Sequence, residues 1–168
     1  KTVLGAFGRI DMLINNAGTF GPEGSPGGMR YQSLAHMDYA IWREILEVNL
    51  LAPFRLTVAL APSLRLAARP VVIMLSSDLG SIGNNRLGHS HAYRTSKAGL
   101  NMLTKGIANE WRDLITIAMA PGWCRTGLGG DDAQIDPAPH CLIHVREGLQ
   151  ILDDVLDPRE ALARFGQQ

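Results

Sequence analysis

The chain has 168 residues, 46% hydrophobic and 19% charged, a composition that suits one folded domain with a buried core and excludes wholesale disorder. Sixteen basic residues balance sixteen acidic ones, which excludes the concentrated basic excess of a nucleic-acid binder or a membrane-surface patch. Uninterrupted apolar runs are shorter than the roughly 18 residues of a membrane span. Two cysteines are too few for a disulfide framework, so we expect a cytoplasmic protein.

In chain order, short apolar runs alternate with longer stretches of helical spacing. The apolar runs, bounded by turn residues, predict buried strands at residues 12–15, 71–76 and 115–120. Helical spacing of apolar residues predicts helices at residues 36–68, 92–111 and about 142–155. Pro53 and Pro62 should kink or break the first of these helices.

This alternation predicts an α/β class with a doubly wound parallel sheet, in a single domain over residues 1–168. Ligands bind at the carboxyl ends of the strands in such sheets. Two glycine-rich stretches, residues 18–28 and 127–136, follow predicted strand ends. We therefore expect the chemistry of the protein to lie in these loops.

The tetrapeptide Asn15-Asn16-Ala17-Gly18 directly follows the first predicted strand. Asparagine amides can fix a turn, and Gly18 lets the backbone approach a ligand closely. Taken alone, the tetrapeptide is more typical of an ordinary turn.

Tyr93 and Lys97 stand four residues apart on the second predicted helix, so both side chains project from the same face. A phenol is a poor proton donor at neutral pH because its pKa is about 10. A neighbouring ammonium lowers that pKa, so the pair is a candidate acid/base for protonating an alkoxide. The spacing alone is common in proteins.

Two further segments follow strand ends. Ser76 and Ser77 end the middle strand, where a hydroxyl could bond a substrate carbonyl oxygen, although serines also cap strands and start loops. Pro121 and Gly122 follow the third strand, where the backbone and Thr126 could meet a cofactor amide or phosphate. Pro-Gly is also an ordinary turn dipeptide.

In this order and spacing, the motifs resemble the short-chain dehydrogenase/reductase family. The matching segments are residues 11–18, 48–49, 75–77, 93–98 and 121–123. Within that family the chain is most similar to carbonyl reductases of the C-factor/sniffer type. The resemblance implies a Rossmann-like sheet and an oxidoreductase that moves a hydride between NADP or NAD, with NADP favoured, and a small carbonyl or alcohol.

The resemblance also implies residue roles. Tyr93 would be the general acid/base, and Lys97 would lower the pKa of Tyr93 and bind the nicotinamide ribose. Ser77 would orient the substrate carbonyl, with Ser76 or Ser81 as alternatives, and Asn49 would hold a water in a proton relay. The expected cofactor contacts, besides Tyr93 and Lys97, are Asn16, Ala17, Gly18, Pro121, Gly122, Trp123 and Thr126.

The resemblance further implies a mobile substrate loop at residues 127–139 and a homo-oligomer formed through the two long helices. From the balanced charge we expect no nucleic-acid or membrane partner.

The sequence departs from the family pattern at both ends. The glycine-rich phosphate-binding turn that precedes residue 12 in the family is absent, as is the end of the last strand. We therefore expect a partial domain whose strand at residues 12–15 forms an exposed edge. If the polypeptide has only these residues, little or no dinucleotide binding is expected, because the turn and helix N-terminus that hold the pyrophosphate are missing. The alternative function is a catalytically inactive fragment or interaction module that retains the motif residues.

A zinc site is conceivable at the histidines. His89 and His91 precede Tyr93, and His140 and His144 flank Cys141. No fourth ligand stands at a suitable spacing, so we expect no metal.

Overall fold

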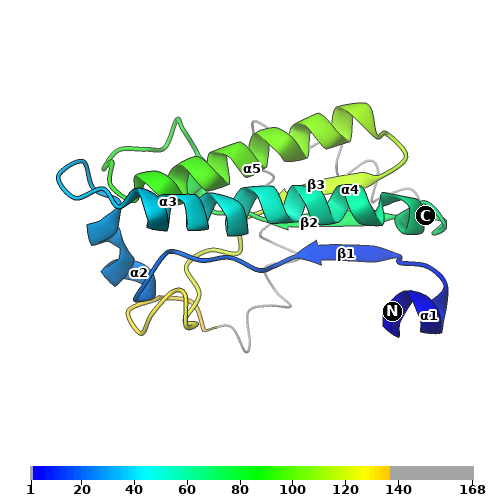
Figure 1. The fold of residues 1–168 in the computed structure, drawn as a ribbon, viewed down its shortest axis with the longest axis horizontal. Helices are drawn as coiled ribbons and strands as arrows, with labels where there is room; N and C mark the ends of the chain where they lie inside the picture. Colours follow the sequence, from blue (N-terminus) through cyan, green and yellow to red (C-terminus); the bar gives the residue numbers. More distant parts are fainter. Residues whose placement is uncertain (1, 137–168) are drawn as a thin grey trace.

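A computed structural model describes residues 2–136 of the chain. Within them, β1 (Met12–Asn15), β2 (Val71–Leu75) and β3 (Ile115–Met119) form one parallel sheet in the order β1-β2-β3 (Figure 1). The α/β class and its parallel sheet are confirmed. The last two strands end one residue earlier than predicted, because Ser76 and Ala120 already begin the loops beyond the sheet.

The strand register aligns all three carboxyl ends. Met12 lies opposite Val71, and Val71 lies opposite Ile115. Because the strands are parallel and nearly equal in length, the loops that follow them leave from the same edge of the sheet. These loops begin at residues 16, 76 and 120, where the sequence predicts the functional site.

The first long helix is continuous, so the prolines do not break it, but its hydrogen-bond pattern changes just before Pro53. It comprises α3 (Tyr39–Leu46), a π-helical turn η2 (Glu47–Leu51) and α4 (Ala52–Leu64). The side chain of Asp38 caps the start of α3, accepting hydrogen bonds from two backbone N–H groups, which explains why the helix begins later than predicted.

The π-helical turn accommodates Pro53 within the continuous helix. Pro53 lies just after the π-helical turn and has no N–H to donate to the preceding turn. Pro62 lies inside α4 without ending it, and the helix stops two residues later at Leu64.

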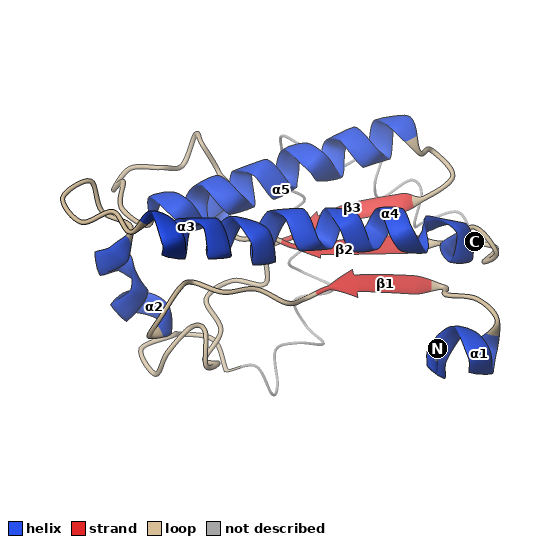
Figure 2. Ribbon diagram, in the orientation of Figure 1, coloured by secondary structure: helices blue, strands red, loops and turns tan. Residues whose placement is uncertain are grey.

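Helix α5 (His91–Glu110) agrees with the helix predicted at 92–111 to within one residue at each end. It packs with α4 on one face of the sheet (Figure 2). The buried core between them is built from β2, the two helices and the turn before β3, and it contains Ala61, Leu64, Val72, Met74, Leu100, Ile107 and Leu114.

The continuous helix Tyr39–Leu64 is longer and more apolar than the short uninterrupted apolar runs of the sequence suggest. Its 26 residues include a window with mean hydropathy 1.4, which is long and apolar enough to cross a membrane by length and composition alone. The helix nevertheless carries two buried polar side chains, Asn49 and Thr57, that bond to other elements. Only 28% of that window is buried within the described part of the chain, and its outer surface carries exposed apolar side chains such as Leu56 and Val58.

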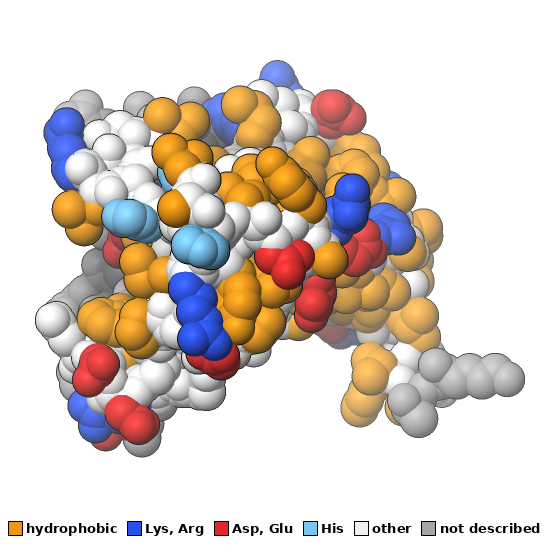
Figure 3. Space-filling model, turned by 60° about the vertical axis from the view of Figure 1, so that its left-hand side comes forward, with side chains coloured by type: hydrophobic (Ala, Val, Ile, Leu, Met, Phe, Trp, Pro, Cys, Tyr) orange, Lys and Arg blue, Asp and Glu red, His pale blue; other side chains and the backbone are white. Residues whose placement is uncertain are grey.

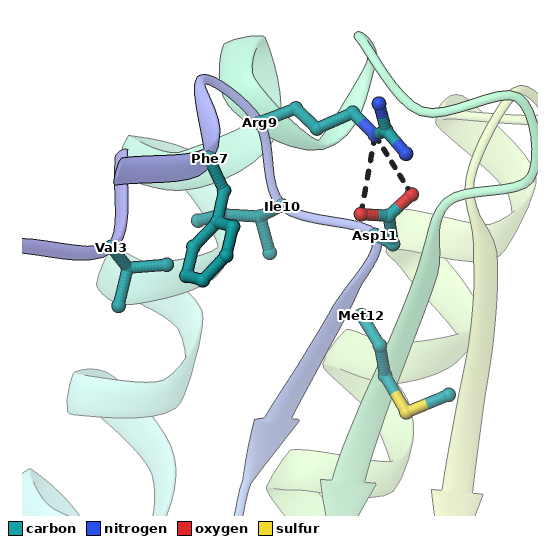
Figure 4. A pocket seen from close by; sticks show the side chains of 6 residues that line it. All are labelled: Val3, Phe7, Arg9, Ile10, Asp11 and Met12. Atoms are coloured by element: carbon teal, nitrogen blue, oxygen red, sulfur yellow. Dashed lines mark hydrogen bonds and ion pairs between the residues drawn. The ribbon is translucent and has the colours of Figure 1, made fainter. Parts of the chain in front are cut away.

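Strand β1 forms an edge of the sheet within the described residues, as expected, and its Met12 and Ile14 are each 52% exposed. A hollow of about 410 Å³ lies at the amino end of this strand, beside α1 (Thr2–Phe7). Its lining includes the grouped side chains of Val3, Phe7 and Ile10 and an Arg9–Asp11 ion pair (Figure 4). The hollow is therefore at the opposite end of β1 from the loops that carry the motifs.

Three short helical elements in the loops were not expected from the sequence. They are α2 (Gly24–Gly27), the 3-10 turn η1 (Gly28–Tyr31) and the 3-10 turn η3 (Asp78–Gly80). The helix expected at residues 142–155, the end of the substrate loop at 137–139, and His140, Cys141 and His144 lie outside the described residues.

The packing of the core predicts that two leucines at the end of the first long helix contribute very differently to the free energy of unfolding. Leu64 has no exposed surface and Leu66 is 66% exposed. Leu64→Ala should lower the free energy of unfolding by about 2–5 kcal/mol, because it leaves a cavity under the sheet. Leu66→Ala should change it by less than about 0.5 kcal/mol. Chemical denaturation measures both, and equal losses would contradict the packing described.

Candidate active site

The structure gathers the four expected catalytic side chains at the carboxyl edge of the sheet. Ser77 follows β2, and its hydroxyl lies near enough to Tyr93, in the first turn of α5, to lower the pKa of the Tyr93 phenol. The Lys97 Nζ atom lies 5.6 Å from the centre of the Tyr93 ring. Asn49 lies in the π-helical turn, and its Oδ1, like Lys97 Nζ, borders Gly18.

Tyr93 is buried, with 7% of its surface exposed. Burial raises the pKa of its phenol above the usual value, and the hydrogen bond from Ser77 opposes this rise. The sequence predicted a pKa lowered by Lys97. The direction is the opposite, because loss of water around the phenol outweighs the stabilisation of the phenolate.

The alternative serines are engaged elsewhere. Ser76 Oγ donates to Asn101 Oδ1 at 2.6 Å, and Ser81 Oγ accepts from the Asn84 N–H at 3.3 Å. Ser77 Oγ accepts from the Leu79 N–H at 3.2 Å while it bonds Tyr93. The geometry therefore favours Ser77 over its neighbours as the hydroxyl beside the phenol.

Lys97 is 4% exposed, and its Nζ donates to the Leu75 carbonyl at 2.7 Å. Burial lowers the pKa of Lys97 to about 8, because the charged form loses water. A lysine in this state is poised to gain or lose a proton near neutral pH.

Asn49 has no exposed surface, and its amide bridges two segments. Its Nδ2 donates to the Thr19 carbonyl at 2.8 Å and to Ser96 Oγ at 3.1 Å, while its Oδ1 accepts from the Thr19 N–H at 2.8 Å. The side chain is thus fully used in holding the loop after β1 against α5.

Of the expected cofactor residues after β1, Gly18 lies beside Lys97. Asn16, Ala17 and Gly18 are exposed. A Cβ at position 18 would lie 3.4 Å from Asn49 Oδ1 and 3.7 Å from Lys97 Nζ, so glycine keeps a space open beside both groups. A ribose hydroxyl could meet donors and acceptors in this space, so the residues fit the nicotinamide ribose that the family resemblance implies.

The expected cofactor residues after β3 bond mainly within their own loop. Pro121 is half-buried, and Gly122 has a positive φ of 81°. Trp123 Nε1 donates to the Gly129 carbonyl at 2.8 Å, and Thr126 Oγ1 accepts from the Gly129 N–H at 3.2 Å. The structure therefore shapes a folded loop here, without a described contact from Trp123 or Thr126 to Tyr93 or Lys97.

This loop packs on the loop after β1. The Ser25 N–H donates to the Leu128 carbonyl at 3.0 Å, and a Cβ on Gly130 would lie 2.6 Å from the Ser25 carbonyl oxygen. The glycine at 130 is therefore required for the close approach of the two loops.

Sequence reasoning missed two residues that contact Tyr93. The Phe20 ring lies 4.6 Å from the Tyr93 ring between centroids, and Gln32 Oε1 accepts from the Tyr93 N–H at 2.8 Å. Neither belongs to a motif or a periodic pattern. They meet Tyr93 only because the loop after β1 folds back over the start of α5.

Charged side chains of both signs are dispersed over the face in Figure 3. Within residues 2–136, no group of three or more His, Cys, Asp or Glu side chains is placed to hold a metal ion. Within the described residues, the site at the carboxyl edge of the sheet consists of a phenol, an ammonium, hydroxyls and amides.

The buried lysine predicts a specific pH dependence of stability. Native Lys97 loses its proton near pH 8, whereas the unfolded side chain keeps it to about 10.5. Between these values the unfolded chain binds more protons, so the free energy of unfolding should rise with pH. The wild type should gain about 2 kcal/mol relative to Lys97→Met between about pH 7.5 and 9.5.

Urea denaturation of both proteins at several pH values measures this gain. The window ends below the titration of Tyr93, whose raised pKa acts in the opposite direction above about pH 10. Parallel stability curves for the two proteins would contradict the buried, desolvated state of Lys97.

Known proteins were compared with this chain by sequence and by structure. A sequence model of the family described as short chain dehydrogenase matches residues 1–135. C-signal of Myxococcus xanthus is 36% identical over 163 residues, which cover 96% of this chain and 90% of that protein. A 3-oxoacyl-(acyl-carrier-protein) reductase of Escherichia coli is 32% identical over 124 residues, covering 73% of this chain and 46% of the reductase.

Solved structures give the same picture. The carbonyl reductase Sniffer of D. melanogaster superposes with a TM-score of 0.73 and 29% identity, covering 84% of this chain and 59% of that one. A short-chain dehydrogenase/reductase from Burkholderia multivorans with bound NADP superposes with a TM-score of 0.71 and 32% identity, covering 86% and 61%.

The chain thus spans nine-tenths of C-signal but less than two thirds of these two structures and about half of the E. coli reductase. The parallel sheet with helices is the Rossmann-like fold of these neighbours. With four-fifths of its length matched by the family model, the chain belongs to the short-chain dehydrogenase/reductase family.

Proposed function

We propose that the protein is an NAD(P)-dependent oxidoreductase that reduces a small carbonyl substrate, with Tyr93 as the general acid. The observation that carries this proposal is the grouping of a buried phenol, a serine hydroxyl bonded to it and a buried ammonium at one edge of the sheet. The open space at Gly18 beside Lys97 supports a bound nicotinamide ribose.

In the proposed reaction, the nicotinamide supplies a hydride when bound. Ser77 donates a hydrogen bond to the substrate carbonyl oxygen and orients it toward Tyr93. Tyr93 gives its phenolic proton to the same oxygen as negative charge develops there. Its raised pKa keeps the phenol protonated at neutral pH, which favours reduction over alcohol oxidation.

The proton lost by Tyr93 is restored through Lys97. With a pKa near 8, Lys97 can release and regain a proton at neutral pH. Asn49 holds the loop beside Lys97 through its side-chain bond to the Thr19 carbonyl, and the family resemblance supports its role in a relay that delivers protons through a water.

The cofactor preference and the assembly are further parts of the proposal. NADP is favoured, supported by the bound NADP of the Burkholderia multivorans structure. A homo-oligomer through the long helices is supported by exposed apolar side chains on their surfaces, at Leu56, Val58 and Met102.

A second candidate is an interaction or signalling module without turnover. The specific observation in its favour is the match to C-signal, which covers nine-tenths of that protein and bears the name of a signal rather than a reductase. Such a module would need the fold but not the phenol of Tyr93.

Tyr93→Phe separates the two candidates. We expect it to lower the rate of NADPH-dependent carbonyl reduction by about 100-fold or more, because it removes the proton donor and keeps the ring. Tyr39→Phe is the matched control, since Tyr39 is 64% exposed on α3 and should retain activity. Circular dichroism confirms that both variants fold. Equal rates for the two variants, or no turnover of any carbonyl by the folded wild type, would refute the enzymatic proposal.

A further inference from the structure

Helix α5 begins without a side-chain cap of its own. Ser90, the residue before its first turn, is buried and has a left-handed backbone with φ 49° and ψ 38°, and its hydroxyl makes no capping bond. The first N–H groups of a helix have no partners within the helix, so buried ones need acceptors from elsewhere.

Gln32 supplies acceptors to this turn from a distant loop. Its backbone carbonyl accepts from the His91 N–H at 3.3 Å, and its side-chain Oε1 accepts from the Tyr93 N–H at 2.8 Å. The side chain has no exposed surface. Gln32 thus caps α5 from outside the helix, at the residue that carries the phenol.

The other end of the same amide holds the loop after β1. Gln32 Nε2 donates to the Phe20 carbonyl at 2.8 Å and to the Gly28 carbonyl at 3.2 Å. These partners fix the orientation of the amide, because carbonyls only accept and the Tyr93 N–H only donates. The Phe20 ring in turn packs against the Tyr93 ring and is 4% exposed.

We infer that Gln32 is a positioning residue for Tyr93. One buried amide links the backbone of Tyr93 to the segment whose phenylalanine covers the Tyr93 ring. The inference deepens the proposed function, on which it rests for the catalytic role of Tyr93. The fixed position and the burial of the phenol both depend on this amide.

Two substitutions separate the acceptor role of the Gln32 amide from its donor role. Gln32→Met keeps the length of the side chain and removes all three of its hydrogen bonds. Gln32→Glu keeps an acceptor for the Tyr93 N–H, with a charge that suits a helix N-terminus, but cannot donate to Phe20 or Gly28. Asn109→Leu is the control, since it removes an exposed amide at the far end of the same helix.

The first measurement needs no activity. Phenolate absorbance, with Tyr93→Phe as the blank, gives the pKa of Tyr93, and amide hydrogen exchange reports its N–H. In Gln32→Met we expect exchange at Tyr93 to rise by at least about tenfold and the phenol pKa to fall toward its ordinary value as the ring gains water. Gln32→Glu should retain the exchange protection, and Asn109→Leu should match the wild type in both measurements.

The second measurement is steady-state reduction with NADPH. In Gln32→Met we expect kcat to fall by about tenfold while KM changes by less than about twofold, and Gln32→Glu should recover part of kcat. If Gln32→Met does not fold, the kcat of Gln32→Glu decides, because loss of the Phe20 link should still lower it.

Folded Gln32 variants with the wild-type phenol pKa and exchange at Tyr93 would overturn the inference. Wild-type protein that binds no NADPH and reduces no carbonyl would instead refute the proposed function, while the phenol titration still decides the role of Gln32.

Discussion

The buried amide of Asn49 is the interaction on which the site depends. It bonds both backbone groups of Thr19 and the hydroxyl of Ser96, and the Ser96 hydroxyl donates in turn to the Tyr93 carbonyl at 2.7 Å. The loop after β1 is thereby fixed to the helix of the phenol. The amide occupies this position because it lies in a π-helical turn, which the chain adopts where Pro53 cannot donate to the helix.

Burial sets the electrostatics of the two acid/base groups. Tyr93 and Lys97 are both almost fully covered, so the low-dielectric surroundings favour the neutral form of each. The phenol is held protonated and the lysine titrates near pH 8. A proton donor with a nearby group that can replace its proton is what carbonyl reduction requires, and this arrangement needs no carboxylate partner for Lys97.

The sequence predicted those features that depend on local spacing. The three strands and α5 follow from apolar runs and helical periodicity, and the shared face of Tyr93 and Lys97 follows from their separation of four residues. The helix does not break at Pro53, because a π-helical turn just before the proline accommodates its missing N–H. That outcome depends on packing against α5, which periodicity does not contain.

Contacts between distant segments could not be predicted from the sequence. Gln32 and Tyr93 are 61 residues apart, and a single glutamine in a loop forms no pattern. The choice between Ser76 and Ser77 likewise depended on Asn101, which takes the Ser76 hydroxyl. The direction of the pKa shift at Tyr93 required knowledge of burial, because the neighbouring ammonium alone predicts the opposite sign.

The most direct test of a nicotinamide site in this protein is to titrate the purified 168-residue chain into NADPH and follow nicotinamide fluorescence. If the carboxyl edge of the sheet is a nicotinamide site, the fluorescence should change saturably, and folded Lys97→Met should bind more weakly because it lacks the ammonium beside Gly18. A folded wild-type chain that leaves the fluorescence unchanged would contradict the account and favour an interaction module that retains the motif without the chemistry.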